Sequence, residues 1–115
     1  APTADVQALA ALPGVIVTGG VPDVRPWVTA ANVVVAPLLL ARGVQNKLLE
    51  AMAMARPVVA SPAAAEGIDA DADMHLRIAA EPAAFAAAVC GLLADPAAAA
   101  AMGEAARARM IARYG

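Results

Sequence analysis

Apolar residues gather in four short runs along the chain, and β-branched residues are frequent in them. We predict strands from these runs at 15–18, 33–36, 57–60 and about 75–79. The apolar character is continuous rather than alternating, which is typical of strands that are buried on both faces of a parallel sheet. The runs are therefore predicted to form the central layer of the protein.

Helical segments are predicted between and after these runs. They cover 24–31, 45–55, 81–94 and 96–113. Pro82 and Pro96 each suit the first turn of a helix, and Asp95 suits the N-cap of the last one. The resulting order of strands and helices predicts an α/β fold, a doubly wound, Rossmann-like parallel sheet with flanking helices.

Length, charge and composition limit the number of domains and the kinds of partner that the protein can have. The chain has 115 residues and begins with Ala1, so we expect at most one domain and a piece of a longer protein. The net charge is −2 and the basic residues are scattered, so we expect no nucleic-acid partner. Hydrophobic residues make up 62% of the sequence, but many are alanine, and no strongly apolar window of about 18 residues predicts a transmembrane segment.

Several residues that could carry chemistry have a plainer interpretation. The single cysteine, Cys90, lies among apolar helix residues, so we predict a buried, inert thiol. The acidic run 69–73 has Asp-x-Asp spacing but lacks the glycine and glutamate of a calcium loop, so we expect solvated carboxylates and no metal. His75 is expected to be an ordinary histidine at the start of a strand. Ser61 lacks a Gly-x-Ser-x-Gly setting, so hydrolase chemistry has no support.

The run 42–61 is the most informative part of the sequence. It joins a polar loop containing glycine, a helix with Lys47 and Glu50, and a buried strand. A loop that enters a helix presents free backbone N–H groups and the positive end of the helix dipole, which suit phosphate oxygens. Lys47 and Glu50 are three positions apart and share a helix face, so an ordinary surface ion pair is the alternative.

The run 42–61, together with 18–26 and 33–37, resembles the C-terminal half of retaining GT-B glycosyltransferases of family 4, the glycosyl transferases group 1. The nearest likeness is to sugar transferases associated with bacterial exopolysaccharide export. The resemblance implies that 1–115 is a single partial domain of about four strands, which binds a nucleoside-diphosphate sugar without a metal or other cofactor. It also implies a missing N-terminal domain that supplies the acceptor site and a catalytic histidine. A cytoplasmic location is expected, with the inner membrane face as an alternative for the full-length protein.

The resemblance also implies which residues bind the donor. Family members usually carry two glutamates eight positions apart. Glu50 matches the second, which holds the ribose hydroxyls, whereas Arg42 stands where the first contacts the sugar. The arginine could instead engage a phosphate or an acidic sugar. The predicted substrate-binding residues are Val21 near the nucleobase, Gly43, Val44, Gln45 and Lys47 at the diphosphate, Glu50 at the ribose, and also Arg42 and Asn46.

Two questions stay open at this point. In the GT-B domain the strand order is 3-2-1-4-5-6, and the four predicted strands match strands 3 to 6. Either the first strand pairs with the second, or another molecule completes the sheet and makes a homo-oligomer. The alternatives in function are a nucleotide-sugar epimerase of the same architecture and a noncatalytic Rossmann-like interaction module, which Arg42 keeps open.

Overall fold

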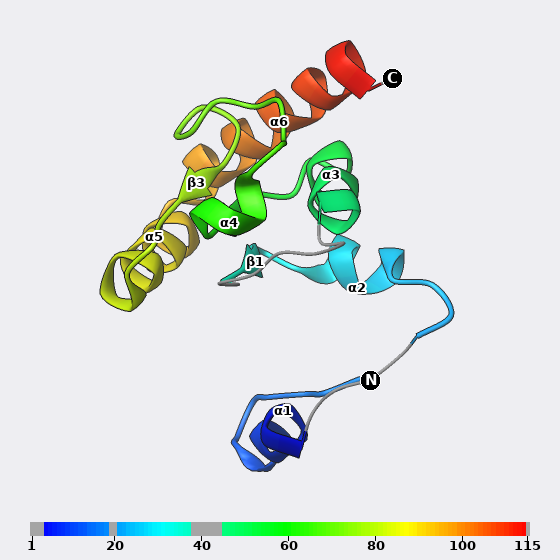
Figure 1. Ribbon diagram of the computed structural model, residues 1–115, viewed down its shortest axis with the longest axis vertical. Helices are drawn as coiled ribbons and strands as arrows, with labels where there is room; N and C mark the ends of the chain where they lie inside the picture. Colours follow the sequence, from blue (N-terminus) through cyan, green and yellow to red (C-terminus); the bar gives the residue numbers. More distant parts are fainter. Residues whose placement is uncertain (1–3, 19–20, 38–44, 115) are drawn as a thin grey trace.

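A short parallel sheet forms the centre of the protein. The computed structural model describes residues 4–18, 21–37 and 45–114. In these segments the strands are β1 (Val34–Ala36), β2 (Val58–Ala60) and β3 (Arg77–Ile78), hydrogen-bonded in the order β1-β2-β3. All neighbours are parallel, with Val34 beside Val58 and Ala60 beside Ile78. Three of the predicted strands are confirmed, and the parallel α/β class with them (Figure 1).

The strand expected over 15–18 is not formed, so the sheet has three described strands instead of about four. These residues belong to no helix or strand and pair with none of the three described strands, and Ile16 is 78% exposed. Figure 1 shows the segment between α1 (Ala4–Ala8) and α2 (Arg25–Ala30), away from the sheet. A β-branched run becomes a strand only where another strand accepts its backbone hydrogen bonds, and no described strand lies beside this one.

The four predicted helices are confirmed to within two residues at each end. They are α2, α3 (Gln45–Ala53), α5 (Pro82–Ala94) and α6 (Pro96–Tyr114). Asp95 caps α6 as expected, because its carboxylate accepts a hydrogen bond of 3.1 Å from the N–H of Ala98. Three short elements were not expected from the sequence: α1, the 3₁₀ turn η1 (Leu9–Ala11) and α4 (Pro62–Ala65). Ser61 is the N-cap of α4, since its hydroxyl accepts the N–H of Ala64 at 3.2 Å.

Helices cover both faces of the sheet. Val58 and Ala60 point into a core cluster that also contains Leu48 and Met52 of α3. Val59 points the other way, into a second cluster with Leu92 of α5. All three residues of β2 are fully buried, which is what the continuous apolar run predicts for the middle strand of a parallel sheet.

Helix α6 joins the two faces. Its first half contributes Ala99 and Met102 to the cluster beside α5, and its second half contributes Ala106 and Met110 to the cluster beside α3. Gly103 lies at the crossing between these halves. An added Cβ there would lie 2.8 Å from the carbonyl carbon of Ala55 and closer still to its oxygen. The absence of a side chain therefore lets α6 pass directly over the end of α3.

Helix α3 ends in a Schellman motif. The N–H of Ala55 donates to the carbonyl of Met52, and the N–H of Arg56 donates to the carbonyl of Ala51, both at 3.0 Å. Ala55 has a φ of 60°, a left-handed conformation that usually selects glycine. This turn aims the Ala55 carbonyl at α6 and directs the chain into β2.

The predicted burial of Cys90 is wrong, because the thiol is exposed. Helix α5 is rich in alanine on every side, so the sequence does not define which of its faces is covered; the structure buries Leu92 and partly buries Phe85 and Val89 instead. In the segments that the structure describes, no single helix is both long and apolar enough to cross a membrane. Helices α5 and α6 meet that criterion only as a pair, with a bend of 103° between them.

Candidate functional site

The start of α3 lies at the carboxyl edge of the sheet. The chain leaves β1 at Ala36, enters α3 at Gln45 and returns to the sheet in β2, which is parallel to β1. A helix in such a connection runs antiparallel to the strands, so its N-terminal end is beside their carboxyl ends. Ligands of open α/β sheets bind at this edge, and the first turns of α3 are therefore at the expected place for a site.

The structure describes four of the predicted donor-binding residues on this helix. Gln45, Asn46, Lys47 and Glu50 occupy its first two turns; Asn46 and Lys47 are exposed, and Gln45 and Glu50 are half-buried. The amide Nε2 of Gln45 donates to the carbonyl of Glu66 at 3.5 Å, which links the helix to the segment after α4. Three more of the predicted residues, Arg42, Gly43 and Val44, lie outside the described residues.

Lys47 and Glu50 are not paired with each other. Four ion pairs join side chains of the described segments, and none of them contains Lys47 or Glu50. The surface ion pair that was the alternative for these two residues is therefore absent from this structure. Both groups are left available for other partners at the start of α3.

Glu50 also has a charged neighbour on α2. Arg25 binds Asp23 through two guanidinium nitrogens, with distances of 2.9 to 3.2 Å. Hydrogen bonding to Asp23 and the charge of that carboxylate raise the pKa of Arg25, and the charge of Glu50 raises it further. The Asp23 carboxylate also accepts the backbone N–H of Arg25 at 3.0 Å. Val21, the predicted nucleobase contact, is partly buried two residues earlier.

A cavity of about 710 Å³, which was not expected from the sequence, opens at the same edge. Its walls include Pro37, Ser61 and Ala79, each of which follows the last residue of a strand, and Glu81 and Phe85 at the start of α5. The lining is mostly apolar, with the Glu81 carboxylate as its charged group. The rule that ligands bind beyond the carboxyl ends of parallel strands could have identified these residues.

A match to a known protein family agrees with the α/β fold of the chain. The family model described as "Glycosyl transferases group 1" matches residues 1–95, which include the whole sheet and α3. The chain belongs to the group 1 glycosyl transferases. No match was found among curated protein sequences. The family supports a role in glycosyl transfer, and the Rossmann-like sheet is that of a glycosyltransferase domain.

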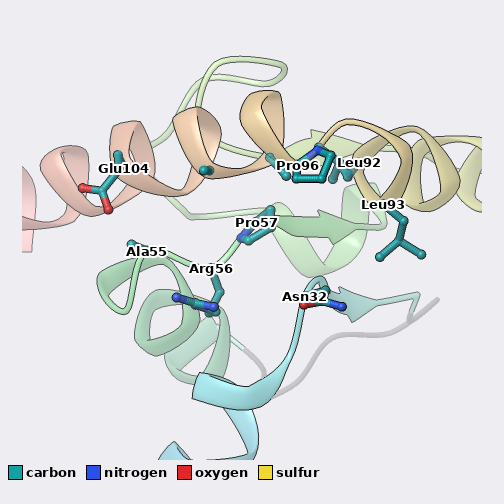
Figure 2. Close-up of a pocket in the computed structure, with 10 residues that line it drawn as sticks. Asn32, Ala55, Arg56, Pro57, Leu92, Leu93, Pro96 and Glu104 are labelled. Carbon is teal, nitrogen blue, oxygen red and sulfur yellow. The ribbon is translucent and has the colours of Figure 1, made fainter.

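A second cavity of this glycosyltransferase domain lies at the opposite, amino edge of the sheet. Figure 2 shows its lining residues between the turn that precedes β2 and the junction of α5 and α6. The cavity has a volume of about 320 Å³. Arg56 on its wall donates to the carbonyls of Met54, Thr29 and Ala31, each at 3.4 Å. The guanidinium of Arg56 thus binds carbonyl groups at the ends of α2 and α3. We therefore give this cavity a structural role and no ligand.

The acidic segment of the glycosyltransferase domain pairs with arginines. The Asp69 carboxylate bonds Arg109 at 3.1 Å and Arg113 at 3.2 Å, both on α6. Asp73 pairs with Arg77 at 3.3 Å. Among the described residues, no group of three or more metal-ligating side chains comes together.

His75 of the same segment is buried in a turn. Its Nδ1 accepts the N–H of Asp71 at 2.9 Å, so the ring stabilises the turn before β3. His75 lies two residues before β3, close to the strand start that was expected at about position 75, and the contact gives the histidine a structural role.

Proposed function

We propose that this chain is the donor-binding part of a retaining glycosyltransferase of family 4. In this proposal the enzyme moves a sugar from a nucleoside-diphosphate sugar to a saccharide or lipid-linked acceptor during bacterial polysaccharide synthesis, as exopolysaccharide-associated transferases do. The observation that carries the proposal is the position of α3. Its first two turns bring Lys47 and Glu50, unpaired with each other, to the carboxyl edge of the sheet of a group 1 glycosyl transferase.

The chemistry of these residues suits a diphosphate leaving group. Negative charge grows on the diphosphate as the bond to the sugar breaks, and the ammonium of Lys47 with the N–H groups at the start of α3 would stabilise that charge. Glu50 lies about 7.5 Å along the helix axis from Gln45 and would accept hydrogen bonds from ribose hydroxyls. No metal or other cofactor is required for this arrangement.

The remaining parts of the reaction are assigned to other segments. A separate N-terminal domain would supply the acceptor site and the catalytic histidine, so the 115-residue chain by itself is expected to be inactive. Arg42 and the neighbouring Gly43 and Val44 would complete the diphosphate contacts. We place the full-length protein in the cytoplasm, at or near the inner membrane face where lipid-linked acceptors are found. The edge of β1 that pairs with none of the described strands is the surface that we propose for a homo-oligomer.

Kinetics of the intact protein test this proposal. Replacing Lys47, the only lysine of the chain, by alanine removes a charge-assisted contact to phosphate, worth about 1.5–3 kcal/mol, so kcat/KM should fall roughly 10- to 150-fold. Glu50→Ala should weaken donor binding and raise KM, because ribose contacts are made equally before and during the reaction. Activity would be measured as transfer from a radiolabelled nucleotide sugar.

Two exposed residues of α6 provide matched controls. Glu104 lines the amino-edge cavity, and Arg107 is one turn further on. Glu104→Ala and Arg107→Ala remove one charge of each sign and should leave kcat/KM within about twofold of the parent. Equal activity of Lys47→Ala, Glu50→Ala and both controls would contradict the proposal and favour a noncatalytic module.

A further inference from the structure

The segment between α4 and β3 is fastened to the end of α6 through one residue, Asp69. Figure 1 shows this segment beside the C-terminal half of α6. The backbone N–H of Asp69 donates to the hydroxyl oxygen of Tyr114 at 3.0 Å, and its carbonyl accepts from Nε of Arg109 at 2.9 Å. The carboxylate binds Arg109 at 3.1 Å and Arg113 at 3.2 Å. Every polar group of Asp69 therefore has a partner in the last two turns of α6.

The contacts between Asp69 and α6 fix more than a distance between charges. The side chain of Arg109 is 22% exposed, and its guanidinium binds both the carbonyl and the carboxylate of Asp69. A planar guanidinium that makes two bonds also fixes the orientation of its partner. The pair of Asp73 and Arg77 in the same segment differs, because it joins residues four positions apart and reaches only the strand that follows.

The same segment contacts the start of the proposed donor site. The carbonyl of Glu66 accepts a hydrogen bond of 3.5 Å from Nε2 of Gln45, the first residue of α3. Glu66 and Asp69 are three positions apart, so the chain between them can span about 10 Å. Gly67 makes a turn with a φ of 84°, and Ile68 packs against the core cluster beside α3. Residues 66–69, which we call the strap, thus join the end of α6 to the start of α3.

We propose that Asp69 is a positioning residue for the donor site and that it acts through Glu66 and Gln45. The inference rests on the proposed function, since it takes the diphosphate to lie at the start of α3. Backbone N–H groups at a helix end bind phosphate well only when their orientation is fixed. The side chain of Gln45, bound to the strap, fixes this orientation, and Asp69 holds the strap against α6. A carboxylate outside the donor site thereby contributes to donor affinity.

Kinetics of the intact protein with matched variants test the role of Asp69. Asp69→Asn and Arg109→Ala should lower kcat/KM for the nucleotide sugar about 2- to 30-fold, as expected for residues that act on a site without touching its ligand. The KM for the acceptor should not change, because the acceptor site is assigned to another domain. Asp73→Asn and Arg107→Ala remove the same charges from the same two segments without touching the strap, and should stay within about twofold of the parent.

Double variants separate positioning from a general loss of stability. If Asp69 acts through Gln45, Gln45→Ala should lower kcat/KM by itself, and Asp69→Asn added to it should cause no further loss. In NMR spectra of the chain without donor, the amide signals of Gln45 and Asn46 should shift in Asp69→Asn and stay unchanged in Asp73→Asn. Losses that multiply in the double variant, or amide signals of α3 that do not move, would overturn the proposal.

The outcomes also separate this proposal from the function on which it rests. Loss of activity in Lys47→Ala, with full activity in Asp69→Asn and Arg109→Ala, would overturn the role of Asp69 and leave the proposed function intact. Full activity in all three variants would overturn both. Circular dichroism checks that each variant is folded. If Asp69→Asn does not fold, Tyr114→Phe removes only the hydroxyl bound to the Asp69 N–H and should lower kcat/KM at least about twofold.

Discussion

Replacing glycine by alanine should have opposite effects on the free energy of unfolding at Gly91 and at Gly103. Both glycines lie inside helices, Gly91 in α5 and Gly103 in α6. Alanine at an unobstructed helix position is favoured over glycine by about 1 kcal/mol. An added Cβ at Gly91 has no heavy atom within 4 Å, so Gly91→Ala should raise the free energy of unfolding by about 0.5–1 kcal/mol.

The clash at Gly103 outweighs that gain. The added Cβ would lie 2.8 Å from the carbonyl carbon of Ala55, and a backbone carbonyl cannot rotate away as a side chain can. Helices α3 and α6 must separate, which loosens the packing of the buried Met102 and Ala106. Overpacking of this kind costs about 1–3 kcal/mol, and more where backbone must move. After the helix gain is subtracted, we expect Gly103→Ala to lower the free energy of unfolding by about 2 kcal/mol.

Chemical and thermal denaturation of the two variants measures this difference. A loss of about 2 kcal/mol lowers Tm by roughly 8 °C in a domain of this size, whereas Gly91→Ala should raise it by a few degrees. Unfolding should be followed by circular dichroism at several denaturant concentrations, with both variants in the same buffer. If Gly103→Ala were as stable as Gly91→Ala, the close passage of α6 over the end of α3 would be refuted.

Three further predictions concern local contacts. Ala55→Gly should stabilise the protein by about 1 kcal/mol, because the residue has a φ of 60°, and denaturant midpoints measure the gain. Ser61→Ala should cost about 1 kcal/mol in the same assay, because it removes the hydroxyl that caps α4; Ser61→Thr keeps a hydroxyl and should recover part of it. NMR titration of the Asp23 carboxyl carbon should give a pKa below that of an ordinary exposed aspartate, because Arg25 donates hydrogen bonds to it, and Arg25→Ala should raise the value. Since folding lowers this pKa, Asp23 stabilises the folded protein at pH values above its unfolded pKa, and this contribution is lost as the pH falls through its folded pKa. A pKa equal to that of an ordinary exposed aspartate would show that Arg25 does not bind Asp23 in solution.

The sheet and main helices were predictable because local pattern determines them. Strand β2 is a short apolar run between Pro57 and Ser61, and α6 has both its proline and its capping aspartate in the sequence. The failure at 15–18 has the opposite cause. A strand needs a neighbour, and a local pattern of β-branched residues cannot supply one.

Burial and cavities were harder to predict. Cys90 was placed in the core because its helix is apolar on all sides, so the sequence carried no signal for the exposed face. A cavity of about 390 Å³ between α3 and α6 is lined by both Glu50 and Tyr114, residues that are far apart in the sequence and have no shared motif. The carboxyl-edge cavity differs, because the positions of Ser61 and Glu81 follow from strand ends and a general rule.

The central claim is that the first turns of α3 bind a nucleoside-diphosphate sugar. NMR titration of the isotopically labelled chain with uridine, guanosine and adenosine diphosphate sugars tests it most directly, because amide shifts detect even millimolar binding. We predict shifts that cluster from Gln45 to Glu50, with a preference for one base. A well-dispersed spectrum with no shifts at these residues, or with shifts confined to Asn32 and Arg56 at the amino edge, would contradict the claim.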